Sequence, residues 1–201
     1  PMLVLTGGDC FERPDLVDLI EYAVGKGLHV SISPSVTPLF TRERVKAVQD
    51  AGVSVMSMSL DGGSAETHDA FRGFPGTFDR TIEACHMLNE LGMRFQLNTV
   101  FTAKNIHEAP QMLKNAIDLG AFMFYTFMLV PTGRGQHLDM LTPHEREDVL
   151  HWLHDNSTRI AIKTTEAPQY RRIAFQREAV RQGKAAPAKH GELYHWLTKE
   201  T

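Results

Sequence analysis

Predicted strands and predicted helices alternate along this chain of 201 residues. The alternation occurs about six times, at a spacing of about 25 to 35 residues, which is long enough for a helix to connect parallel strands. No G-x-G-x-x-G sequence follows the first strand, so nothing supports a dinucleotide-binding fold. We therefore predict an α/β fold, a partial TIM-like (β/α) barrel with helices outside and a ligand site at the carboxyl ends of the strands.

Turn residues and helix caps place the boundaries of these segments. Predicted strands cover 2–5, 28–33, 53–60, 94–101, 122–130 and 159–164. The fifth is so apolar that we expect it to be buried on both faces. Predicted caps are Thr41 and Thr77, Asn105 with Glu108 resembles a capping box, and Thr142 with Glu145 is predicted to start another helix. Residues 1–182 are the predicted barrel core, and 183–201 a linker with the start of a C-terminal region.

Composition argues against several classes of function. The formal net charge is −3 and no run is rich in lysine or arginine, so we expect neither nucleic acid nor a membrane as partner. The two cysteines, Cys10 and Cys85, argue against a disulfide framework and fit a reducing compartment. No apolar run approaches the roughly 20 residues of a membrane span, and no leader precedes the first strand. We therefore expect a cytoplasmic protein.

A glycine pair and a carboxylate, Thr6-Gly7-Gly8-Asp9, follow the first predicted strand. Without Cβ atoms, Gly7 and Gly8 can turn sharply and offer open backbone groups to a ligand, and Asp9 could hold a cation. A tight turn from strand to helix needs the same glycines, so both interpretations stay open at this point.

Polar residues that follow the other predicted strands should gather at the same rim. They suit a polar ligand with an amine, a carboxylate and a sugar, and they are Ser33, Ser59, Asp61, Asn98 and the turn Gly133-Arg134-Gly135. Ser59 and Asp61 could equally bond their own turn, whereas the amide of Asn98 needs several partners inside a strand. We find no hydrolytic triad or nucleophile elbow, and no metal site is predicted among the histidines.

Several segments together resemble a known family. They are Thr6-Gly7-Gly8-Asp9, Ser59-Leu60-Asp61-Gly62, His68-Asp69 with Arg72-Gly73, Pro131-Thr132-Gly133-Arg134-Gly135 and Thr165-Glu166-Ala167-Pro168-Gln169-Tyr170-Arg171-Arg172. Their order and spacing resemble the radical S-adenosylmethionine (radical SAM) superfamily, in the branch that usually carries a C-terminal SPASM domain with auxiliary iron–sulfur clusters. The last two segments look closest to members that act in haem biosynthesis. In the first segment, Asp9 stands where the family has Glu.

The resemblance implies S-adenosylmethionine as cofactor. Gly7, Gly8 and Asp9 would receive its methionyl amine, which suits a carboxylate because the amine is cationic. The other residues that it implies are Ser59 near the ribose or carboxylate, Asn98 in the same pocket, Arg72 as a carboxylate partner, and the backbone of Val130 and Pro131 near the adenine. Ser33 and Asp61 complete the predicted cofactor-binding set.

The resemblance also implies a four-iron, four-sulfur cluster, which three cysteines in C-x-x-x-C-x-x-C hold in the family. This chain lacks that motif, and Cys10 and Cys85 lie too far apart in the sequence to replace it. In the family the cluster loop precedes the strand that ends in the glycine pair, and this chain opens almost directly on that strand. We therefore expect a fragment of a larger enzyme, with sequence missing before Pro1.

For the whole enzyme, the resemblance implies cleavage of S-adenosylmethionine to a 5′-deoxyadenosyl radical that abstracts hydrogen from a tetrapyrrole or peptide substrate. Flavodoxin or ferredoxin would supply the electron, and this chain alone should be inactive. Two other hypotheses stay open. One is a cluster-free barrel that binds a nucleoside-like ligand or acts as a scaffold, and the other is an ordinary barrel enzyme such as an aldolase, which no strand-borne lysine supports. The unpaired edge of the first strand also predicts self-association.

Overall fold

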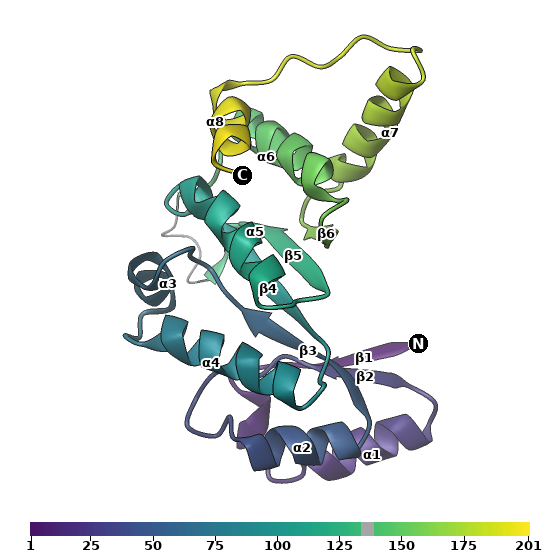
Figure 1. Cartoon of the computed structure of the whole chain (residues 1–201). Coiled ribbons are helices and arrows are strands. Elements are labelled where there is room, and N and C mark those ends of the chain that lie inside the picture. The colour runs from purple at the N-terminus through teal and green to yellow at the C-terminus, as the bar shows by residue number, and fades with distance from the viewer. Residues whose placement is uncertain (134–138) are drawn as a thin grey trace.

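The computed structural model describes residues 1–133 and 139–201. Its strands form one parallel sheet in the order β1-β2-β3-β4-β5-β6, so each strand pairs with the next along the chain. The strands are β1 (Met2–Leu5), β2 (His29–Ile32), β3 (Val53–Ser59), β4 (Phe95–Phe101), β5 (Met123–Met128) and β6 (Ala161–Thr165). The sheet curls into half a barrel with helices around it (Figure 1), which confirms the predicted partial barrel.

Helices connect successive strands and cover the outside of the curled sheet, and the last two helices follow β6 (Figure 1). They are α1 (Leu16–Gly25), α2 (Arg42–Asp50), α3 (Ala65–Arg72), α4 (Thr77–Glu90), α5 (Ala109–Asp118), α6 (Pro143–Asn156), α7 (Gln169–Arg181) and α8 (Glu192–Glu200), with the short 3-10 helices η1 (Cys10–Glu12) and η2 (Ile106–Glu108). In the part of the chain that the structure describes, no helix has both the length and the apolar character that crossing a membrane requires.

The two faces of the sheet differ in burial because side chains alternate along each strand. In β4, Phe95 and Leu97 are buried in the core beneath the helices, whereas Gln96 and Asn98 on the opposite face are half-buried. We call this opposite face, which carries Gln96 and Asn98, the open face. The carboxyl ends of all strands meet at one edge of the sheet, so the predicted rim residues are brought to the same end of the molecule.

The expectation that the fifth strand is buried on both faces is wrong. Phe124 and Met128 of β5 are buried against the helical layer, but Met123, Tyr125 and Phe127 on the open face are only half-buried. The apolar composition of the strand hides this alternation, because aromatic and sulfur-containing side chains stand on both faces. β5 therefore presents aromatic rings to the concave side of the half-barrel.

We predicted Thr77 as the cap of helix α4, but the structure differs. Its N-cap is Gly76, whose backbone is left-handed with a φ of 75°, and Thr77 lies in the first turn. The carboxylate of Asp69 accepts hydrogen bonds from the amides of Gly76 and Phe78. The capping group thus comes from the preceding helix, whereas the predicted cap Thr41 and the predicted helix start at Thr142 are confirmed. Thr142 and Glu145 form a capping box there.

Helix α3 was not predicted from the sequence. The local sequence signals for this helix are only its two caps. The hydroxyl of Ser64 accepts a hydrogen bond from the amide of Thr67, and Gly73 ends the helix in a left-handed conformation with a φ of 77°. The eight residues between them carry no clear apolar stripe, because His68 is the buried residue of the helix.

The last helix packs on the helical layer of the barrel. The carboxylate of Asp148 in α6 accepts hydrogen bonds from the amides of Gly191 (2.8 Å) and Tyr194 (3.3 Å), which fixes the start of α8. Leu193 and Leu197 of α8 are buried. Most of the predicted linker, 184–191, carries neither helix nor strand.

Candidate functional site

The glycine turn after β1 leaves its backbone uncovered. Gly7 has a φ of 154°, a conformation that favours glycine, and a Cβ added to Gly7 or Gly8 would meet no atom within 4 Å. Open space rather than crowding therefore surrounds both residues. This is the environment that the sequence predicted for backbone groups that receive a ligand.

Asp9 already has three donors inside the protein. The residue is 8% exposed, and its carboxylate accepts hydrogen bonds from the amides of Phe11 (3.1 Å) and Ser35 (3.3 Å) and from the hydroxyl of Thr37 (2.6 Å). The hydroxyl of Ser35 in turn donates to the carbonyl of Gly8 (2.8 Å). Asp9 thus caps η1 and ties the glycine turn to the loop after β2. Its contact with a methionyl amine stays a prediction.

Replacing Asp9 by alanine is expected to lower the free energy of unfolding by about 2 kcal/mol, because a helix cap and two further hydrogen bonds are lost. Asp9→Asn should lose less, since the amide oxygen can still accept. Urea denaturation measures both. Asp15→Ala is the matched control, because Asp15 precedes α1 without a side-chain cap bond and should change stability little. Equal losses in the two alanine variants would contradict the role given to Asp9.

Four residues of the open face stand in register on four neighbouring strands. Ser59 pairs with Asn98, Asn98 with Tyr125, and Tyr125 with Lys163. We call these four residues the open-face row. The side-chain amide of Gln96 donates a hydrogen bond to the Asn98 oxygen (2.8 Å), which orients the Asn98 side chain. The structure therefore brings Ser59 and Asn98 together, as predicted, and adds Tyr125 and Lys163.

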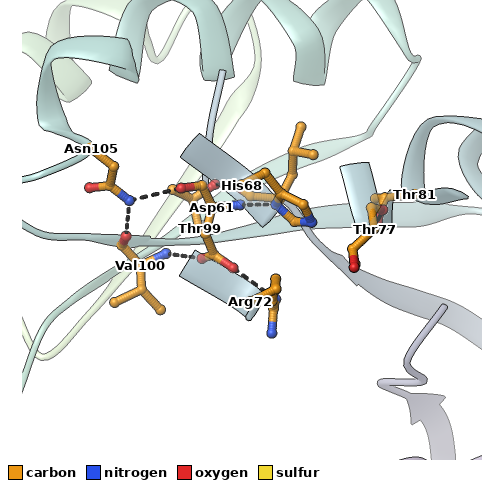
Figure 2. A network of polar contacts seen from close by, with 9 residues as sticks. Asp61, His68, Arg72, Thr77, Thr81, Thr99, Val100 and Asn105 are labelled. Atoms are coloured by element: carbon orange, nitrogen blue, oxygen red, sulfur yellow. Dashed lines mark hydrogen bonds and ion pairs between the residues drawn. The ribbon is translucent and has the colours of Figure 1, made fainter. Parts of the chain in front are cut away.

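A buried network joins the end of β3 to β4 and α3 (Figure 2). The Asp61 carboxylate accepts a hydrogen bond from the Val100 amide (2.8 Å), and its second oxygen lies 2.8 Å from the Arg72 guanidinium. The side-chain amide of Asn105 donates to the carbonyls of Asp61 (3.0 Å) and Val100 (2.8 Å). Asn105 is the N-cap residue of η2 by position, but its side chain makes no cap hydrogen bond, so the predicted capping box is not formed. The side chain instead holds the backbone of Asp61, two residues after Ser59.

Glu108 also differs from its predicted part in a capping box. Its carboxylate accepts hydrogen bonds from the amides of Gly63 (2.6 Å) and Ser64 (3.1 Å) and from the hydroxyl of Thr67 (2.5 Å). It thus binds the first turn of α3 from η2, more than 40 residues away in the sequence. Such a long-range partner explains why the local pattern around Asn105 was misleading.

Burial controls the ionisation of the network. Burial raises the pKa of Asp61 above its usual value, and the charge of Arg72 opposes this rise. Burial also lowers the pKa of His68 to about 4, so His68 is neutral at pH 7. Its Nδ1 accepts a hydrogen bond from the Asp61 amide (3.0 Å), which leaves the ring proton on Nε2. Asp61 and His68 are at most 1% exposed. Direct contact of Asp61 with a ligand stays a prediction.

The other predicted rim residues lie at the same edge of the sheet. The amide of Ser33 donates to the Leu5 carbonyl (2.9 Å), so Ser33 continues the pairing of β2 with β1 beside the glycine turn. Val130 and Pro131 follow β5 and are exposed. Arg134 and Gly135 of the predicted turn lie outside the described residues.

The cysteines do not fit an iron–sulfur cluster. Cys10 and Cys85 are both buried, and burial raises their thiol pKa values to about 11 and about 12, so neither offers the thiolate that cluster iron binds. Across residues 1–133 and 139–201, no group of three or more His, Cys, Asp or Glu side chains could hold a metal ion.

Sequence reasoning missed Tyr125, Lys163 and Thr165. The statement that no lysine lies on a strand is wrong, because Lys163 is in β6 on the open face. Lys163 is exposed, whereas the lysine of an aldolase must be desolvated to act as a nucleophile, so the aldolase hypothesis gains no support. The predicted strands 122–130 and 159–164 contain Tyr125 and Lys163, but only the strand register shows that the two residues are neighbours, since 38 positions separate them in the chain.

Comparisons with known proteins agree with the fold and the motifs. The family described as the radical SAM superfamily matches residues 1–116. An AdoMet-dependent heme synthase of Methanosarcina barkeri is 39% identical over 99% of this chain and 57% of its own length. One of Oleidesulfovibrio alaskensis is 41% identical over 88% of this chain and 46% of its own length. A PqqA peptide cyclase of Methylocella silvestris is 32% identical over 58% of this chain. The chain thus spans about half the length of the heme synthases it matches.

Solved structures share the fold at low sequence identity. Streptococcus suis SuiB bound to S-adenosylmethionine superposes with a TM-score of 0.67 and 14% identity, over 82% of this chain and 39% of that one. A domain of pyruvate-formate lyase-activating enzyme from Bacteroides vulgatus gives a TM-score of 0.60 and 13% identity, over 81% of this chain and 98% of that one. The half-barrel and the family match over more than half of the chain lead to one conclusion: the chain belongs to the radical SAM superfamily.

Proposed function

We propose that this chain forms the S-adenosylmethionine-binding wall of a radical SAM enzyme whose substrate is a tetrapyrrole. Membership of the family implies S-adenosylmethionine and a four-iron, four-sulfur cluster as cofactors. When bound, this pair supplies a 5′-deoxyadenosyl radical for hydrogen abstraction. Two relatives named AdoMet-dependent heme synthase match 88% or more of the chain, whereas a peptide cyclase matches 58%, which supports a tetrapyrrole over a peptide.

The observation that carries this proposal is the pairing of Ser59 with Asn98 on the open face, at the edge where the glycine turn also lies. Gly7 and Gly8 would offer backbone groups to the cationic amine in the open space around them, although the Gly8 carbonyl already accepts a hydrogen bond from the Ser35 hydroxyl. The Ser59 hydroxyl and the Asn98 amide would bind neutral polar groups such as ribose hydroxyls. The Asp61 network would position Ser59, because Asn105 holds the backbone two residues further on.

Binding of S-adenosylmethionine to this chain tests the proposal, with saturation-transfer NMR as the measurement. Because no cluster contact contributes here, we expect weak binding, with a dissociation constant on the order of 1 mM. Ser59→Leu and Asn98→Leu should each abolish the transfer signal, since a bulky apolar side chain would fill the face and remove a polar partner.

The matched control is Ser54→Leu, which makes the same change at the amino end of β3, away from the predicted rim. Its transfer signal should equal that of the unchanged chain. A missing signal in the unchanged chain, or an equal signal in all three leucine variants, would overturn the proposed binding wall.

Anaerobic iron–sulfur reconstitution tests the other half of the proposal. Neither cysteine of this chain fits a cluster, so we expect the chain by itself to remain colourless and to form no 5′-deoxyadenosine. A protein extended upstream to include three closely spaced cysteines should gain both the colour of the cluster and the formation of 5′-deoxyadenosine. Cluster-free S-adenosylmethionine binding by the extended protein would instead support the hypothesis of a binding protein or scaffold.

A further inference from the structure

The open face has two chemically different halves. Most residues that β2 to β4 place on it are uncharged and polar, such as Ser31, Ser57, Ser59, Gln96 and Asn98, with Val55 and Val100 as apolar members. β5 and β6 add Tyr125, Phe127, Lys163 and Thr165. The S-adenosylmethionine wall proposed above uses the first half. The second half combines aromatic surface with a positive charge.

Lys163 holds a defined position in this second half. It is the only Lys, Arg, Asp or Glu in the six described strands. Its ammonium nitrogen lies 4.4 Å from the centre of the Tyr125 ring, and the Tyr125 hydroxyl is hydrogen-bonded to the Thr165 hydroxyl. Lys163 is exposed and makes no ion pair with the residues that the structure describes. The cation is therefore held over a ring with its charge free for a ligand.

The neighbouring aromatic surface limits the kind of ligand. The rings of Tyr125 and Phe127 lie with centroids 4.4 Å apart and are tilted by 33°, and both are half-buried on the open face. Such a pair offers apolar area for a flat, conjugated molecule. The ammonium group beside it offers a partner for an anionic group at the periphery of that molecule, and a carboxylate is the anion that a tetrapyrrole of the haem type carries.

The position of Lys163 also fits a ligand larger than an amino acid. Along the open-face row, Lys163 and Ser59 are separated by three strand spacings, or roughly 14 Å. A small substrate beside the S-adenosylmethionine wall would not reach Lys163. A tetrapyrrole can place one part of its ring system near that wall and a carboxylate near Lys163.

We propose that Lys163, with Tyr125 and Thr165, forms a subsite that binds a carboxylate of a flat tetrapyrrole substrate, whose ring lies against Tyr125 and Phe127. This inference rests on the proposed function for the class of substrate. It assigns to β6 a role in specificity, which differs from the binding of the cofactor by β1, β3 and β4.

Titration of the chain with coproporphyrin III, followed by porphyrin fluorescence, tests the subsite. Lys163→Gln should weaken binding about fivefold, the size expected for one solvent-exposed ion pair. Lys163→Glu should weaken it further, because the new charge repels the carboxylates. The tetramethyl ester of coproporphyrin III should bind the unchanged chain and Lys163→Gln equally, since it carries no carboxylate.

The chain offers a matched control for the lysine. Lys26 also lies over a tyrosine ring, 5.2 Å from the centre of Tyr22, but at the end of α1. Lys26→Gln should bind coproporphyrin III like the unchanged chain. Equal weakening of acid and ester binding in Lys163→Gln would overturn the carboxylate contact, as would unchanged binding of the acid.

A second measurement separates the subsite from a purely structural role of Lys163. Lysines on edge strands oppose pairing with other chains. If that were the role of Lys163, Lys163→Gln would self-associate in sedimentation experiments and bind coproporphyrin III unchanged, which would overturn the subsite. Saturation transfer from S-adenosylmethionine should be the same in Lys163→Gln as in the unchanged chain. Failure of cofactor binding and failure of the subsite therefore give different results.

Discussion

Replacing Arg72 by alanine is expected to lower the free energy of unfolding by about 3 kcal/mol at neutral pH. Asp61 would keep its hydrogen bond from the Val100 amide but lose its counter-charge in a site where its side chain is 2% exposed. The Arg72 side chain is itself 35% exposed, so we expect a loss at the lower end of the range for broken buried ion pairs. Urea denaturation of the two chains measures the difference.

The effect of Arg72→Ala should depend on pH in a defined direction. Burial raises the folded-state pKa of Asp61 above its unfolded value, so the stability that Asp61 contributes is present at low pH. That stability is lost as pH rises through the folded-state pKa. Without Arg72 this pKa is higher still, and the loss continues over a wider range of pH. The deficit of the variant should therefore be small in acid, where Asp61 is protonated in both chains, and should widen as pH rises.

Arg80→Ala is the control for this experiment. Arg80 lies in the next helix, where its guanidinium contacts the Pro75 carbonyl and the Thr77 hydroxyl in an exposed position. Its replacement should change stability by less than about 0.5 kcal/mol at any pH. A deficit of Arg72→Ala that stays constant with pH, or that equals the deficit of Arg80→Ala, would contradict the ion pair with Asp61.

Replacing Gly62 by alanine should destabilise the protein by about 3 kcal/mol or prevent folding. A Cβ at this position would lie 2.4 Å from the backbone nitrogen of His68, 2.9 Å from its Cα and 3.0 Å from the Ser64 carbonyl oxygen. These are backbone atoms of α3 and its cap, so a rotamer change cannot relieve the overlap. The helix would have to move away from the end of β3, and with it His68 and Arg72 of the network.

Gly25→Ala provides the comparison for Gly62. Gly25 ends α1, has no atom within 4 Å of an added Cβ, and does not have a left-handed backbone. Alanine there should raise stability by about 0.5 kcal/mol, because it reduces the freedom of the unfolded chain. Midpoints of urea denaturation that are equal for the two variants would show that α3 does not pack on Gly62 as described.

Much of the barrel could be predicted because its signals are local. The apolar runs that became β3 and β4, and the polar caps that became Thr41 and Thr142, are read from neighbouring residues. The motif at Gly7 and Gly8 pointed to a turn after a strand, and the structure has that turn. Helix α3 escaped prediction because its single buried side chain is a histidine rather than an apolar stripe.

The sequence by itself determined the strand and helix alternation, the parallel sheet and the family, because periodicity and motif spacing are properties of the chain read in order. The tertiary structure decided which polar groups meet. Val100 binds Asp61 across 39 positions, and Glu108 binds Thr67 across 41. Only the register of β3 to β6 places Ser59 and Lys163 in one row. These contacts depend on strand pairing and on buried charge finding a partner, which no stretch of neighbouring residues encodes.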